Sequence, residues 1–577
     1  MTAPGSAAAE STPRSRGAPR GMPVYLDTPD GFARKAEWVL ATMLAALGVP
    51  LRVVRDRSEA AACVLAYALA PVPGVPTLPC SGDAIDLIAH SRRLPNNSFR
   101  LYHHAESGSG ATGPRTGVSG VSDAGGVTGV SDASGVSGKD GVNVSRHAAL
   151  LGAFPVQADG FAASFDVIAS AFVLLAAWDE RTSAVRDRYG RLPYDESLFA
   201  RNTALGPRAL VDPPVDAYVA LLRDLLTPRL AALRLPPLPH LTWDDLGPAE
   251  ASDRTGGTRG DGEQGDGEAA ACGGRFAVAL THDVDNVKRW TARGLGGALK
   301  RAAQAALAND FARARWEAFG LARALAWDMP RGADPYWTFP DLLEREDRAG
   351  VTSTFFVIAS HGAAIDGARP EVYHERMPRL ARLLRRHARE VGLHGNQRDR
   401  DDAAALREDR AVLAERVGTT VDGMRYHYLR CLYHETLPLL DGEGFVYDTS
   451  LAFGEHEGYR CGFSHPFHPY DLAHDRPLAL VELPLAVMDS TLQERHYRAL
   501  AAPDAREAAL AALRPLTRSR GAAALLWHHN RFDPYVGRGY GPVYWDLLDW
   551  IRRHGGVATS AIDIVKRWQR RAGETTL

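Results

Sequence analysis

Hydrophobic positions follow one pattern from residue 275 to the C-terminus. Short apolar runs rich in Val, Leu, Phe and Thr alternate with longer stretches whose apolar residues recur every three to four positions. The short runs are typical of buried strands and the longer stretches of amphipathic helices, so their alternation predicts strand–helix units. Seven or eight units over about 300 residues predict a parallel (β/α) barrel. The predicted strands are 276–283, 353–360, 390–395, 423–429, 445–451, 480–487, 523–529 and 556–561.

The chain before this region predicts a smaller α/β accessory domain. Strand-like runs at 24–30 and 50–56 enclose the helical pattern 32–48, and two apolar helical patterns follow at 165–185 and 215–233. Two low-complexity segments are typical of flexible connections. The predicted divisions are a disordered N-terminus 1–22, an accessory domain 23–246 with a Gly/Ser-rich insertion 106–144, a flexible linker 247–274 and a barrel 275–577.

Composition excludes several classes of protein. The 67 basic and 69 acidic side chains nearly cancel, which argues against a nucleic-acid-binding protein. No run of eighteen apolar residues predicts a membrane span, and the first 22 residues lack the apolar core of a secretory signal. Five cysteines without CxxC spacing fit a reducing compartment. We therefore expect a cytoplasmic protein; its oligomeric state cannot be predicted.

The excursion 286–338 between the first two barrel strands departs from this neutrality. Its first 42 residues carry eight basic and two acidic side chains. A helical insertion with a solvated basic face is one interpretation. The other is that the excursion lines the mouth of the active site and attracts an anionic substrate.

Polar residues collect where the predicted barrel strands end, which is where barrel enzymes place their active sites. The strand ends read THDVD from Thr281, GLHGN from Gly392, RYHYLR from Arg425, YDTS from Tyr447 and LLWHHN from Leu525. One such end alone would be unremarkable, but five in order are hard to attribute to chance.

In their order and spacing, THDVD, STFFV, EVGLHG, GMRYHYLR, YDTS and LLWHHN resemble the motifs of the polysaccharide deacetylase family, also called NodB homology or carbohydrate esterase 4. The resemblance covers roughly residues 275–560. It implies a NodB-type deformed (β/α)7–8 barrel. It also implies a hydrolase that removes N-acetyl, or less often O-acetyl, groups from an amino sugar in a polysaccharide or glycan precursor by metal-activated water.

The resemblance also implies roles for individual residues. Asp283 matches the catalytic base, and Arg425 matches the arginine that pairs with it. Asp285 matches the metal-binding aspartate. Alternation along an extended strand would aim the two carboxylates the same way. Asp448 matches the aspartate that orients the acid histidine.

The metal set is incomplete at one position. His394 matches the first histidine of the family's metal pair, but the second position, four residues later, is Arg398, which cannot bind a cation. Other side chains, or water, could supply the missing ligand: His282, His427, His465, His468 and His528 are the candidates. Zinc is the expected ion for a carboxylate–imidazole site.

The resemblance implies that one of two adjacent histidines is the general acid. Strand alternation lets only one of His528 and His529 point inward. Because the motif that this segment resembles places an acidic or amide residue directly after the acid histidine, Asn530 favours His529. His427, His465, Trp527 and His528 are candidate substrate-binding residues, and the stretch 455–469 is expected to form a loop over the pocket.

Two other functions stay open. Arg398 is also compatible with a metal-independent hydrolase of cyclic amides on the same barrel, or with a catalytically inactive glycan-binding relative.

Overall fold

The computed structural model describes residues 21–103, 149–156, 160–239, 242–243, 276–290, 292–326, 334–360 and 370–573. The predicted insertion 106–144 and linker 247–274 lie outside these ranges, as do residues 1–20. Within the described ranges, no helix combines the length and the apolar character that a membrane crossing requires.

The N-terminal region is the predicted α/β unit. Its main sheet has four parallel strands, which pair in the order β2-β1-β3-β4. An antiparallel pair, β5 and β6, flanks the undescribed segment 104–148. The strands are β1 Met22–Asp27, β2 Leu51–Val54, β3 Leu65–Ala68, β4 Thr77–Pro79, β5 Arg100–His103 and β6 Ala149–Gly152. The helices are α1 Asp30–Ala45, α2 Gly82–Ala89, α3 Val167–Leu175, α4 Trp178–Thr182, α5 Leu198–Arg201, α6 Arg208–Val211 and α7 Pro214–Ala232.

The second region is built on one curled parallel sheet. The strands pair in the order β14-β11-β10-β9-β8-β7-β16-β15, and β17 adds to β7. Apolar side chains of β7 are buried on both faces, as a sheet covered on both sides requires. The strands are β7 Ala277–Val284, β8 Thr354–Val357, β9 Glu390–Gly395, β10 Gly423–Tyr426, β11 Tyr447–Asp448, β14 Val481–Glu482, β15 Leu485–Met488, β16 Ala522–Leu526 and β17 Val557–Thr559.

The two edges of this sheet meet in the segment 481–488. The edge strands β14 and β15 are separated by only Leu483 and Pro484. The Leu483 amide donates to the carbonyl of Asp448 on β11 (2.9 Å), and the Ala524 amide of β16 donates to the carbonyl of Pro484 (2.7 Å). The sheet therefore closes into a deformed barrel, and the predicted fold class is confirmed.

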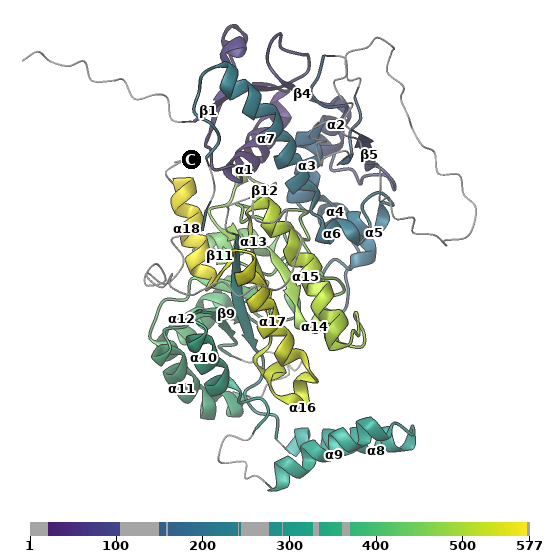
Figure 1. Cartoon of the computed structure of the whole chain (residues 1–577), viewed down its shortest axis with the longest axis vertical. Coiled ribbons are helices and arrows are strands. Elements are labelled where there is room, and N and C mark those ends of the chain that lie inside the picture. The colour runs from purple at the N-terminus through teal and green to yellow at the C-terminus, as the bar shows by residue number, and fades with distance from the viewer. Residues whose placement is uncertain are drawn as a thin grey trace, which may run out of the picture.

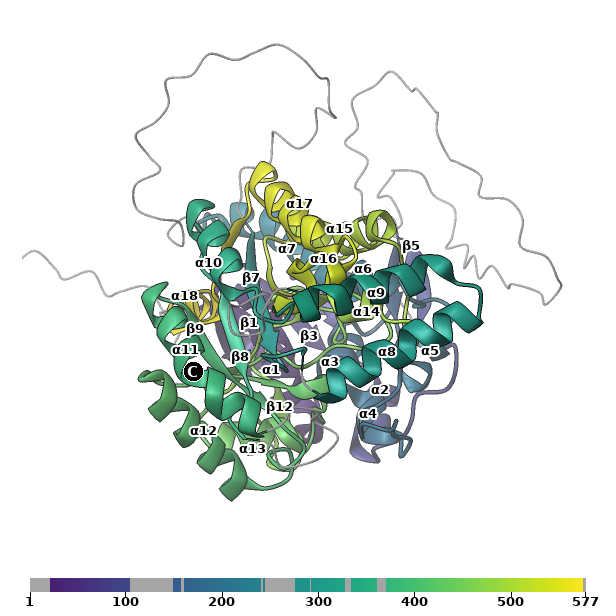
Figure 2. The ribbon, with the colours of Figure 1, turned by 90° about the horizontal axis from the view of Figure 1, so that it is seen from below.

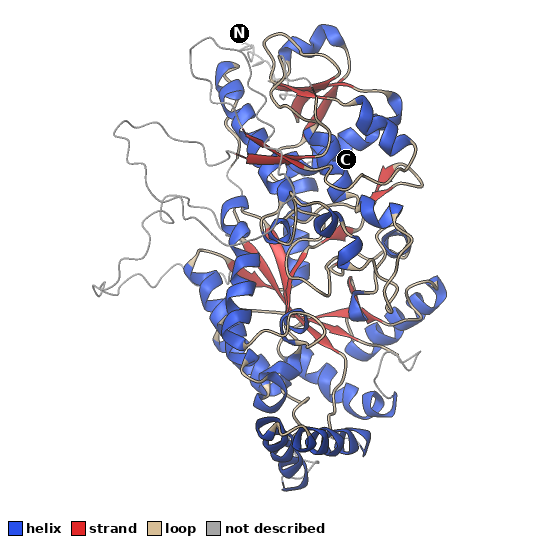
Figure 3. Ribbon diagram, turned by 90° about the vertical axis from the view of Figure 1, so that its right-hand side faces the viewer, coloured by secondary structure: helices blue, strands red, loops and turns tan. Residues whose placement is uncertain are grey.

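Helices surround this sheet (Figure 3). The helices are α8 Ala292–Leu307, α9 Phe311–Ala326, α10 Phe339–Arg348, α11 Pro370–Arg386, α12 Ala403–Val417, α13 Thr436–Gly442, α14 Asp489–Gln493, α15 Ala502–Ser519, α16 Pro534–Gly537, α17 Tyr540–Arg553 and α18 Ala561–Gly573. Helix α12 shows how the sequence sets their ends. The Asp402 side chain accepts hydrogen bonds from two amides of its first turn, and Gly418, at φ 71°, ends it in the left-handed conformation.

The basic excursion forms the helix pair α8–α9. The two helices project from the end of the barrel that is remote from the N-terminal region (Figure 1) and lie side by side when seen from below (Figure 2). The Arg301 guanidinium pairs with Glu317 across them (2.8 Å). The pair is anchored by Trp316, whose Nε1 donates to the carbonyl of Tyr535 (2.8 Å).

The N-terminal region packs directly on the barrel. The largely buried Arg460 and Glu180 form an ion pair across this contact, and Trp38 of α1 donates from Nε1 to the carbonyl of His468 (2.8 Å). Phe172 of α3 contacts Tyr470 edge-on. One hydrophobic cluster runs through both regions, so they share a core. The stretch 455–469, expected over the pocket, instead provides much of this contact, because Arg460 and His468 belong to it.

Candidate metal centre

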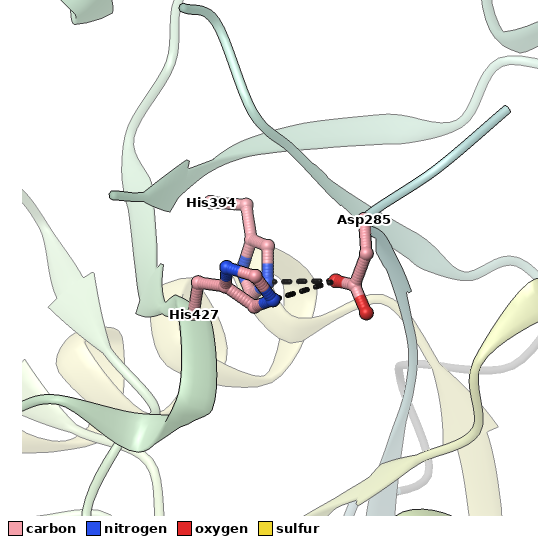
Figure 4. Close-up of side chains that lie close together, drawn as sticks. All are labelled: Asp285, His394 and His427. Atoms are coloured by element: carbon pink, nitrogen blue, oxygen red, sulfur yellow. Dashed lines mark hydrogen bonds and ion pairs between the residues drawn. The ribbon is translucent and has the colours of Figure 1, made fainter. Parts of the chain in front are cut away.

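Three ligand-type side chains converge at the carboxyl ends of β7, β9 and β10. Asp285 directly follows β7, His394 lies in β9, and His427 directly follows β10. The Asp285 Oδ1 lies 3.1 Å from Nε2 of His394 and 3.8 Å from Nε2 of His427 (Figure 4). All three ligand atoms lie within 4.8 Å of one another. This buried group could hold a metal ion whose identity the residues do not fix.

The surroundings orient these side chains towards one another. The Nδ1–H of His394 donates to the carbonyl of Arg425 (3.0 Å), which fixes the ring with Nε2 facing Asp285 (3.1 Å). Burial works against ionisation of Asp285, but His427 and His394 outweigh it and hold the pKa of the carboxyl well below its usual range. A carboxylate with two imidazoles is a donor set that suits zinc and similar divalent ions.

Arg398, which stands where the resemblance implies a second metal-binding histidine, turns away from this centre. Its guanidinium pairs with Asp409 of α12 (2.8 Å) and with Glu408 (3.3 Å). His427 occupies the third position instead. Sequence reasoning included His427 both among the possible missing ligands and among the substrate-binding candidates; the structure groups it with Asp285 and His394.

Asp283 lies beside the centre and contacts Arg425, as the sequence predicts. Its Oδ1 accepts a hydrogen bond from Arg425 (3.2 Å), and its Oδ2 lies 3.8 Å from Nε2 of His394. Arg425 is fully buried and also donates to Thr281 and Thr449, so its orientation is fixed. The carboxylate of Asp283 is thereby held at the pocket without being among the three grouped ligands.

Of the two adjacent histidines, His528 faces the pocket. Its Nδ1 lies 2.6 Å from Oδ1 of Asp489, and its Nε2 lies 3.6 Å from Oδ2 of Asp285. Burial opposes protonation of His528, but the carboxylates of Asp489 and Asp285 raise its pKa to about 9. Its imidazolium form therefore predominates at neutral pH.

His529, the histidine that the sequence favours, is enclosed instead. Its ring nitrogens face the carbonyls of Asp283 (3.1 Å) and Asn286 (3.0 Å), and its ring stacks on Phe339 at 4.5 Å. Burial lowers the pKa of His529 to about 4. The alternation argument does not apply because β16 ends at Leu526: His528 lies beyond the strand, and His529 begins the 3-10 helix His529–Phe532.

Asp448, expected to orient the acid histidine, has other partners. Its carboxylate accepts hydrogen bonds from the amide and hydroxyl of Ser450 (2.9 and 2.8 Å). Burial raises the pKa of Asp448 to about 6, and Glu482 on the neighbouring strand β14 faces it. Asp489, which directly follows β15, contacts His528 in its place. A carboxylate at a strand end was a signal that could have identified Asp489 from the sequence.

The remaining predicted side chains lie elsewhere. Trp527 packs against Tyr540 and Tyr544 in a buried cluster. His465 borders a separate cavity of about 760 Å³ between α1 and α18, with Trp38 and Trp568. His282 is fully buried, with its Nε2 3.0 Å from Glu346.

The centre opens into a pocket of about 300 Å³. Met488, Ser490, Glu494 and Tyr497 line it beside the histidines, while no described residue of the excursion 286–338 does. Tyr189 and Arg191 of the N-terminal region also line this pocket. Nothing in the sequence pattern signalled that the accessory domain reaches the site.

Comparisons with known proteins find one family model and several solved structures that are similar to parts of the chain. A model described as a family of unknown function, DUF7033, matches residues 135–230. No curated protein matches the chain.

Among solved structures, one from Mycobacterium smegmatis assigned as a polysaccharide deacetylase is 22% identical, covering 52% of this chain and 92% of that one at a TM-score of 0.34. An allantoinase is 14% identical, with coverages of 51% and 91% and a TM-score of 0.34. A carbohydrate esterase 4 pseudoenzyme from Bacillus anthracis is 12% identical, with coverages of 50% and 66% and a TM-score of 0.26. Each of these matches spans about half of this chain.

Proposed function

We propose that this protein is a metal-dependent hydrolase that removes the acetyl group from the nitrogen of an amino sugar in a glycan or glycan precursor. The observation that carries the proposal is the convergence of Asp285, His394 and His427 beside Asp283 and His528. The substrate class follows from the strand-end motifs that resemble those of polysaccharide deacetylases.

The residues around the pocket match the needs of amide hydrolysis. Asp285, His394 and His427 would hold a divalent cation, which supplies a Lewis acid for the acyl oxygen and the attacking water. Asp283, fixed by Arg425, is placed to accept the proton of the water. His528, protonated at neutral pH and oriented by Asp489, is placed to give a proton to the departing amine.

The position of His427 supports this function over its alternatives. Arg398 raised the alternatives of a metal-independent hydrolase and an inactive binding protein because it left the ligand set incomplete. Since His427 supplies a third ligand atom within reach of the other two, Arg398 no longer implies a defective site.

The test is acetate release from N-acetylated oligosaccharides, measured on the purified chain before and after chelation. We expect release that is abolished by the chelator and restored by Zn²⁺. Release that is insensitive to chelation would favour the metal-independent enzyme. Saturable sugar binding without any release would favour an inactive relative.

A further inference from the structure

A short segment of the N-terminal region, Asp187–Arg191, reaches the wall of the candidate site. The segment folds into a tight turn: the Gly190 amide donates to the carbonyl of Asp187 (2.9 Å), and the Asp187 amide donates to the carbonyl of Arg191 (2.9 Å). The Asp187 carboxylate accepts from the Arg191 guanidinium (2.8 Å). This turn presents Tyr189 and Arg191 to the pocket as one fixed unit.

The turn that carries His427 needs outside support. The two residues that follow His427, Tyr428 and Leu429, adopt the left-handed conformation at φ 58° and φ 56°. Two consecutive residues with side chains rarely adopt this conformation, because the Cβ atom crowds the following carbonyl. The surrounding structure must therefore hold the turn, and with it the position of His427.

The segment Asp187–Arg191 supplies that support at Tyr428. Arg191 donates from a terminal guanidinium nitrogen to the carbonyl of Tyr428 (2.9 Å). The rings of Tyr189 and Tyr428 stack at 4.5 Å and 14°, and the rings of Tyr428 and His427 stack at 4.0 Å and 24°. A stack of three rings therefore runs from the N-terminal region to the third ligand of the candidate centre.

Three observations indicate that Arg191 has a defined place here. It is only 5% exposed, although it belongs to a turn. A Cβ atom at Gly454 of the barrel would lie 2.6 Å from a guanidinium nitrogen of Arg191, so the absence of a side chain at Gly454 leaves room for the guanidinium. Its second terminal nitrogen also reaches the hydroxyl of Tyr497 (3.4 Å), another residue of the pocket wall.

We propose that Tyr189 and Arg191 are positioning residues of the metal centre: they hold the His427–Leu429 turn so that His427 completes the ligand set. This inference rests on the proposed metal-dependent function. It gives the N-terminal region, whose matching family has no known function, a task at the active site. Neither residue contacts the ligand atoms, so both act through Tyr428.

The test is isothermal titration of the metal-stripped full chain with Zn²⁺ alone and with Co²⁺ alone. Tyr189→Ala and Arg191→Ala are each expected to weaken binding by roughly 10- to 100-fold, the range that loss of an outer-shell partner causes. Tyr189→Phe keeps the ring stack and should bind as the wild type does. Arg201→Ala is the matched control, since Arg201 pairs with Glu196 in the same region and does not line the pocket.

Circular dichroism and thermal melting distinguish a misfolded variant from one with a local effect on metal binding. Should Arg191→Ala fail to fold, the comparison of Tyr189→Ala with Tyr189→Phe still tests the proposal. Metal affinity unchanged within about twofold in a folded Tyr189→Ala variant overturns the positioning role while the metal centre stands. A wild type that binds neither ion overturns both proposals.

Discussion

At the scale of single residues, the candidate site depends on which of two neighbouring histidines faces the pocket. His528 contacts Asp489 and lies close to Asp285, whereas His529 is enclosed between two carbonyls and Phe339. The side chain of His529 is almost completely buried, and its neutral ring packs against Phe339. His528 is therefore the better candidate for the acid.

Exchange of each histidine for glutamine tests this assignment. His528→Gln removes the only proposed proton donor and should lower kcat by about 10²- to 10⁴-fold with little change in melting temperature. His529→Gln should chiefly lower the melting temperature, because it disturbs a buried ring. Steady-state acetate release and thermal melting of both variants provide the measurements; a larger loss of kcat in His529→Gln than in His528→Gln would reverse the assignment.

The two aspartates after Thr281 should separate in their effects. Asp285→Asn removes a grouped ligand, so metal affinity should fall by at least about 100-fold, together with turnover. Asp283→Asn should abolish most turnover while the protein still binds metal, because Asp283 contacts Arg425 rather than completing the ligand group. Elemental analysis of the purified variants measures their metal content. An equal loss of bound metal in both variants would contradict these roles.

At the scale of elements, the ends of neighbouring strands explain why carboxyls gather. Asp448 of β11 and Glu482 of β14 stand opposite each other in parallel register. Burial, followed by the Asp448 charge, raises the pKa of Glu482 well above its usual range. Because both carboxyls have raised pKa values, the folded state binds protons more tightly than the unfolded chain does.

This pair predicts a pH dependence of stability. The contribution of the pair to the free energy of unfolding is fully present below about pH 4, where carboxyls of the unfolded chain protonate. It is lost as the pH rises through the Asp448 pKa of about 6. Glu482→Gln removes a buried carboxyl that must stay protonated in the folded state, so its apparent free energy of unfolding should exceed that of the wild type at pH 8. The difference should shrink towards pH 5.

Urea unfolding of both proteins at several pH values measures this difference. Asp224→Asn is a suitable control, since Asp224 is half exposed beside Arg223 and should leave the profile parallel to that of the wild type. A Glu482→Gln profile parallel to the wild type from pH 5 to 8 would contradict the prediction.

At the scale of the whole molecule, the N-terminal region and the barrel behave as one packed unit. Glu180 also accepts a hydrogen bond from the amide of Tyr433, so the ion pair with Arg460 is tied to the barrel backbone. A buried pair contributes little net stability when intact, but removal of one partner leaves an uncompensated charge.

Arg460→Met should therefore destabilise the chain by about 3–5 kcal/mol, because Glu180 would remain buried without its partner. The double variant Arg460→Met with Glu180→Gln should recover much of this loss. Chemical unfolding of the single and double variants gives the coupling, and limited proteolysis reports whether the two regions separate. Equal stability of wild type and Arg460→Met would show that the contact does not depend on this pair.

Several features of the site were predictable because they are local to one strand. The barrel strands around Asp283, His394 and Arg425 lie where the apolar runs predict them. Parallel strands place their carboxyl ends at one rim, so the polar residues at those ends were expected to meet. The contact of Asp283 with Arg425 agrees with this expectation.

Other features depended on turns beyond the strand ends. The orientations of His528 and His529 follow from the chain beyond Leu526, where the two-residue period of a strand no longer applies. The position of His427 follows from a turn in the left-handed conformation that no residue type in it predicts.

The sequence by itself determined the barrel, the set of strand ends and most of the chemical groups at the rim, because hydrophobic periodicity and strand polarity act within short segments. Only the tertiary structure decided that His427, and not residue 398, lies with Asp285 and His394. It also decided that Asp489 rather than Asp448 contacts His528, and that Tyr189 and Arg191 reach the pocket. These outcomes depend on contacts between residues far apart in the chain, and such contacts form only when the two regions pack on a common core.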